Sequence, residues 1–157
     1  MTRLTLYRHF ADRDELFAAC MSHWRAAHPA PDSGAWSRIE SFDVRLRRAV
    51  GELYAWYADN GEDLYPLYRD AAFTPPSTQR ARRENIERMV SAILGSGRRA
   101  EATRPLRAAI GHVLAYWTWR SLVVDEGCTH RQAVELGIRF VLASGHAPRA
   151  GSAVRVE

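Results

Sequence analysis

The chain has 157 residues, of which 46% are hydrophobic and 25% are charged. These proportions are those of an average globular protein, and the length suits one domain with a sizeable core, so a fibrous or disordered chain is excluded. The net charge of +4 comes from 22 basic residues, all of them arginine, against 18 acidic residues. So weak a charge permits nucleic-acid binding without requiring it.

The N-terminal stretch and the cysteines indicate the compartment. Residues 1–10 carry charges and no apolar run, so they do not form a secretory signal. Cys20 and Cys128 are isolated, which favours free thiols in a reducing cytoplasm, with a disulfide between them as the alternative. His23 and His28 have no third ligand nearby, so we expect no metal and no cofactor.

Residues 4–17 read LTLYRHFADRDELF. This pattern predicts the end of a short helix, a tight joint at Phe10 and Ala11, and a second helix that begins after Asp12. Asp12 is a good N-cap, and Glu15 three positions later completes a capping box. Negative charge in the first turn also suits the helix dipole.

Thr-Leu-Tyr-Arg-His-Phe followed by Asp-Arg-Asp-Glu-Leu-Phe resembles the junction between the recognition helix and the next helix of TetR-family transcriptional repressors. The resemblance implies an all-α fold with a partial helix-turn-helix head at residues 1–28 and a helical-bundle body at residues 36–146 for ligand binding and dimerisation. It also implies DNA contact through six residues, with Tyr7, His9 and Arg13 on phosphates and Arg3 and Thr5 nearest base edges: Arg3, Thr5, Leu6, Tyr7, His9 and Arg13.

A helix-turn-helix reader needs two helices, one across the DNA backbone and one in the major groove. The sequence supplies the second of these immediately after Met1. We therefore expect operator binding if the head is complete in a longer native product. The alternative is an N-terminally truncated ligand-binding and dimerisation module without DNA binding of its own.

Apolar periodicity predicts the remaining helices in chain order. The helix after Asp12 ends before a Pro- and Gly-rich loop at residues 28–34, and a long amphipathic helix runs from Ser37 to a stop at Asn60-Gly61. A short helix covers residues 64–68, and another covers residues 77–94 and ends at Gly95-Ser96-Gly97.

Residues 108–124 are apolar nearly all round, which predicts one buried central helix. The segment is shorter than the about 20 residues of a membrane span and is interrupted by polar residues, so we expect no membrane contact. Thr129 caps a last apolar helix. Two helices with surplus apolar surface predict a homodimer with a four-helix contact, as the resemblance also implies, through Trp119, Val123, Val134, Ile138 and Val141.

A second set of side chains combines large apolar area with polar tips, as in small-molecule cavities. In the family an inducer binds inside the body, and the candidates here are Trp56, Tyr57, Tyr65, Tyr68, Met89, His112, Tyr116 and Trp117. Ordinary core packing is the alternative for any one of them. We expect a partly apolar ligand with at least one hydrogen-bonding group. No nucleophile, base and orienting group recur at a recognisable spacing, so we expect no enzyme.

Overall fold

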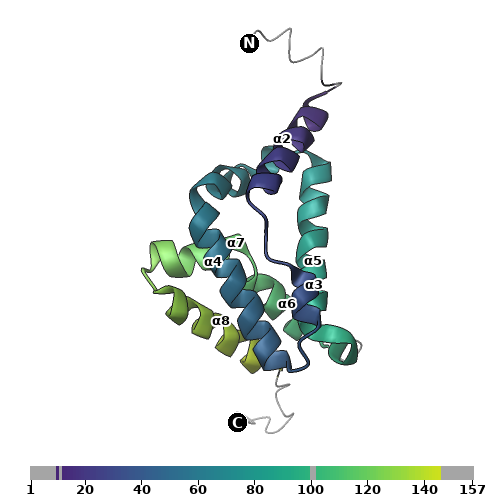
Figure 1. The fold of residues 1–157 in the computed structure, drawn as a ribbon. Coiled ribbons are helices and arrows are strands. Elements are labelled where there is room, and N and C mark those ends of the chain that lie inside the picture. Colours follow the sequence, from purple (N-terminus) through teal and green to yellow (C-terminus); the bar gives the residue numbers. More distant parts are fainter. Residues whose placement is uncertain (1–9, 11, 100–101, 146–157) are drawn as a thin grey trace, which may run out of the picture.

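The computed structural model describes residues 10, 12–99 and 102–145, and every regular element in this part of the chain is helical (Figure 1). The fold is an all-α helical bundle, as predicted. Its elements are α2 (Arg13–Ala27), α3 (Ser33–Ser37), α4 (Phe42–Arg69), the 3-10 turn η1 (Ala71–Phe73), α5 (Pro76–Arg99), α6 (Arg104–Val113), α7 (Tyr116–Arg120), the π-helical turn η2 (Ser121–Asp125) and α8 (His130–Gly145).

Two long antiparallel helices, α4 and α5, form the frame of the molecule (Figure 1). Helix α2 lies at the end of the bundle where α4 finishes and α5 begins. Helix α3 packs on α5, and α8 packs on both α4 and α6. The side chains of Trp36, Leu46, Ile93 and Ile110 are fully buried between these layers.

Side-chain caps set several helix starts. The Asp12 carboxylate accepts a 2.8 Å hydrogen bond from the Glu15 backbone N–H, and the Thr129 hydroxyl accepts one of 3.4 Å from the Gln132 N–H. Both predicted N-caps are therefore confirmed, since each hydroxyl or carboxylate satisfies a first-turn donor that lacks a partner within the helix.

Helix α4 corrects the predicted stop at Asn60-Gly61. It continues unbroken to Arg69, includes the predicted short helix and contains Pro66. Gly61 serves close packing, because a Cβ atom there would lie 2.7 Å from Cη2 of Trp119. The start also differs, because Ser41 caps α4 and Ser37 ends the separate helix α3.

The predicted single helix over residues 108–124 is wrong. Helix α6 ends at Val113, Ala115 has an extended conformation with ψ 140°, and α7 begins at Tyr116. Tyrosines of α4 compensate the break, because the Tyr54 and Tyr57 hydroxyls each donate a 2.9 Å hydrogen bond, to the carbonyls of Val113 and Leu114. These carbonyls would otherwise be unsatisfied at a helix end.

A buried arginine holds the other end of the frame together. The Arg45 guanidinium of α4 donates to the carbonyls of Ile39, Ile93 and Leu94, the last at 3.0 Å. Gly95 follows with φ 67°, a left-handed conformation that suits glycine, and the predicted break at this glycine is present as a kink inside α5. Arg45 therefore joins α4 to the carbonyl groups that the kink leaves open.

None of the helices in the described ranges has both the length and the apolar character that crossing a bilayer requires.

Candidate ligand cavity

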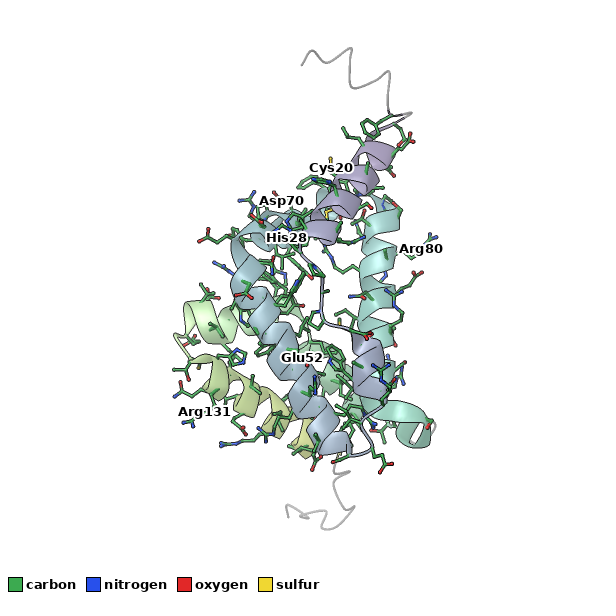
Figure 2. All side chains as sticks on the ribbon, viewed as in Figure 1. Cys20, His28, Glu52, Asp70, Arg80 and Arg131 are labelled. Carbon is green, nitrogen blue, oxygen red and sulfur yellow. The ribbon has the colours of Figure 1, made fainter. Side chains whose placement is uncertain are left out.

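A cavity of about 360 Å³ lies between α2, α4 and α5. His28 at the end of α2 marks its position next to α4 in Figure 2. Helix α2 contributes Met21, Trp24 and Arg25 to the wall, α4 contributes Leu53, Trp56, Tyr57, Leu64, Leu67 and Tyr68, and α5 contributes Arg82, Ile86 and Met89. The volume falls within the range of about 300–1,000 Å³ that small-molecule sites occupy.

Aromatic rings form the floor of this cavity. The Trp24 ring stacks on the His28 ring with centroids 4.5 Å apart and meets Trp56 edge-on at 6.0 Å. Trp56 in turn lies 5.6 Å from the Tyr57 ring. The Trp56 indole N–H is buried and has no acceptor among the described residues. The cavity is therefore lined largely by aromatic rings.

The charged side chains of the wall are all positive. Arg82 lies over the Tyr68 ring at 4.3 Å and donates a 3.3 Å hydrogen bond to the Leu67 carbonyl. Arg25 and Arg88 also line the cavity, and no aspartate or glutamate is among its described lining residues. Burial raises the pKa of the Tyr68 hydroxyl, and the positive charge of Arg82 counteracts part of this rise.

The structure brings four of the eight predicted ligand residues together. Trp56, Tyr57, Tyr68 and Met89 line the cavity. The other four lie elsewhere. His112, Tyr116 and Trp117 are on or next to the break between α6 and α7, and Tyr65 is on the face of α4 that meets α7. Tyr65 and Trp117 pack against each other at 6.1 Å, Tyr116 is buried with its hydroxyl on the Gly61 carbonyl at 2.8 Å, and the exposed His112 lies near Phe140.

Sequence reasoning missed α2 and the arginines of α5 as parts of the wall. Neither Trp24 of α2 nor Arg82 of α5 is among the eight predicted ligand residues, although both line the cavity. The signal for Arg82 was its spacing, because Arg82, Ile86 and Met89 follow at intervals of four and three and therefore share one face of α5.

The predicted dimer contacts need correction. Trp119, Val134, Ile138 and Val141 are buried in the core of the single chain, and Val123 is half-buried. The apolar side chains that α7, η2 and α8 expose are different ones: Trp117, Val124, Leu136 and Phe140, at 46%, 48%, 44% and 49% exposure. Helix α8 has two apolar stripes, and the predicted one faces inward.

The predicted DNA contacts Arg3, Thr5, Leu6, Tyr7 and His9 lie outside the described residues, and so does the side chain of Arg13, the first residue of α2. Within the described ranges, no three histidine, cysteine, aspartate or glutamate side chains gather in a metal-binding arrangement. No family model, curated protein or solved structure matches the chain.

Proposed function

We propose that the chain is a TetR-like, ligand-responsive transcriptional repressor that binds a small, partly apolar molecule in the cavity between α2, α4 and α5. One observation carries the proposal. The cavity wall is shared between the body and α2, the helix that directly follows the stretch resembling a recognition helix. A molecule bound there contacts both parts, so its binding energy depends on the position of α2.

The proposed regulator is a homodimer. Helices α6 and α8 pack together, and their outward side carries Ala108 and His112 from α6 with Leu136 and Phe140 from α8. The His112 and Phe140 rings lie 5.7 Å apart, so the two helices contribute to one continuous face. An exposed apolar face of this kind favours a self-complementary contact with a second copy.

In such a dimer the two heads contact two DNA half-sites one helical turn apart. A ligand that shifts α2 changes the separation of the heads, and operator affinity then falls. Ligand and operator binding are reciprocally linked through the two positions of α2. The mechanism needs no catalytic step.

The alternative is a ligand-binding and dimerisation module that does not contact DNA and acts through a partner. It has the same cavity and the same apolar face. The two functions differ only in whether the protein recognises a DNA sequence.

A selection experiment separates them. The protein purified from its source cells is used to select fragments from a random-sequence DNA library, and the enriched fragments are assayed by gel shift over a salt series. We expect enrichment of two half-sites about 10 base pairs apart and an affinity that falls steeply with salt. Weak binding without sequence preference would reject the repressor and favour the alternative.

A further inference from the structure

We propose that the cavity binds a planar aromatic anion, with its ring against the tryptophan and tyrosine rings and its negative group beside Arg82 and Arg25. This inference rests on the proposed function of the cavity as a ligand site. It adds the charge and the shape of the ligand.

The charge follows from the wall. Three arginines line the cavity without a carboxylate among its described lining residues. Arginines elsewhere in the described chain include some that form ion pairs, such as Arg48 with Glu52 at 2.7 Å and Arg107 with Glu87 at 3.0 Å. The arginines of the wall would repel a cationic ligand, and a neutral ligand would form no ion pair with them.

Arg82 is the best placed of the three. It is half-buried, one of its N–H groups reaches the Leu67 carbonyl, and its guanidinium plane lies over Tyr68. A guanidinium has five N–H donors in a fork that matches a carboxylate or sulfonate. It forms no ion pair with a described carboxylate, so donors remain for an anion in the cavity.

The planar body follows from the rings. Trp24, Trp56, Tyr57 and Tyr68 all belong to the wall. Trp24 meets Trp56 edge-on, and Trp56 is tilted against Tyr57, so the wall presents aromatic surface on which a flat ring can pack.

Calorimetric titration with 1-naphthoate and 1-naphthamide tests the inference, because the two probes share size and shape and differ in charge. We expect one naphthoate per chain, bound at least about tenfold more tightly than naphthamide, as one charge-assisted hydrogen bond predicts. Arg82→Gln should abolish this preference. The control Arg83→Gln removes the same charge from an exposed neighbour that does not line the cavity and should keep the preference.

A second variant, Arg25→Gln, should reduce the preference independently, and thermal melting of each variant establishes that it is folded. Equal affinities of the two probes for the unaltered protein would overturn the anion inference and leave the cavity as a ligand site. Failure of both probes to bind would overturn the planar aromatic anion, whereas the repressor function is tested separately by the DNA selection experiment.

Discussion

Two glycines of α4 have opposite surroundings although both lie in the helix interior. A Cβ atom on Gly61 would lie 2.7 Å from Cη2 and 3.1 Å from Cζ3 of Trp119. A Cβ atom on Gly51 would have no atom within 4 Å. Glycine at position 61 therefore permits α7 to approach α4, whereas glycine at position 51 only weakens the helix.

Alanine substitutions should separate these two roles. We expect Gly61→Ala to lower the free energy of unfolding by about 1–3 kcal/mol, because overpacking against the indole outweighs the gain in helix propensity. The matched control Gly51→Ala should raise it by about 0.5–1 kcal/mol. Urea unfolding followed by circular dichroism measures both. Stabilisation by Gly61→Ala would show that Trp119 does not pack there.

At the scale of elements, the break between α6 and α7 depends on side chains from α4. The hydroxyls of Tyr54 and Tyr57 take the places that backbone N–H groups would fill in a continuous helix. Burial raises the pKa of both hydroxyls, so they stay protonated and continue to donate.

We expect Tyr57→Phe to lower the free energy of unfolding by about 1–3 kcal/mol, because the buried Leu114 carbonyl loses its donor. Tyr65→Phe is the control, since no described residue accepts a hydrogen bond from the Tyr65 hydroxyl. Urea unfolding again measures the difference. An equal loss in the two variants would mean that the carbonyl does not need the hydroxyl.

The same variant offers a readout in alkaline solution. An unfolded tyrosine has a pKa of about 10, and the pKa of folded Tyr57 is higher. The folded state keeps a proton that the unfolded state releases, so this contribution to stability is complete below about pH 10 and is lost as the pH rises further. Tyr57→Phe should therefore lose less stability above pH 10 than the unaltered protein.

Local signals predicted the starts of α2 and α8, but not the use of Gly61 inside α4 or the break after α6. Asp12 and Thr129 act within one turn of the chain, so their role is readable from neighbouring residues. A glycine at position 61 is compatible either with a helix C-cap or with close packing of another helix. Only the contact with Trp119, far along the chain, shows that it serves close packing. The break after Val113 likewise depends on hydroxyls from α4, and no proline or glycine lies between Val113 and Tyr116.

Only half of the predicted ligand residues line the cavity, because contacts between distant parts of the chain decide which side chains face it. Composition singled out Trp56, Tyr57, Tyr68 and Met89, which line the cavity. Trp117 has the same chemistry, but it follows the break and is turned toward the surface. The arginines of α5 that line the cavity were not predicted, because a charged helix face is usually solvated. Arg80, also on α5, does point away from the bundle (Figure 2).

At the scale of the whole molecule, the outward face of α6 and α8 is where a second copy is proposed to bind. Leu136 and Phe140 are one helical turn apart on this face. Three of the residues predicted for the contact, Val134, Ile138 and Val141, lie at intervals of four and three on the buried side of α8. Periodicity finds both stripes, and the packing of α8 on α4 and α6 decides which one remains uncovered.

We expect Phe140→Asp to weaken the dimer at least tenfold, about 1.4 kcal/mol, because the substitution places a charge in an apolar contact. Phe73→Asp is the control, since Phe73 is 77% exposed in η1, away from α6 and α8. Sedimentation over a range of protein concentrations measures the association. A dimer unaffected by Phe140→Asp would move the proposed interface elsewhere.

The three tyrosine hydroxyls near the break also determine how the molecule opens. Tyr54 and Tyr57 reach from α4 to the end of α6, and Tyr116 reaches back from α7 to the Gly61 carbonyl in the middle of α4. Neither side can fray without leaving buried polar groups of the other unpaired. Helices α4, α6 and α7 therefore form one cooperative folding unit, whereas α2, which shares fewer such bonds with the body, can change position while this unit stays intact.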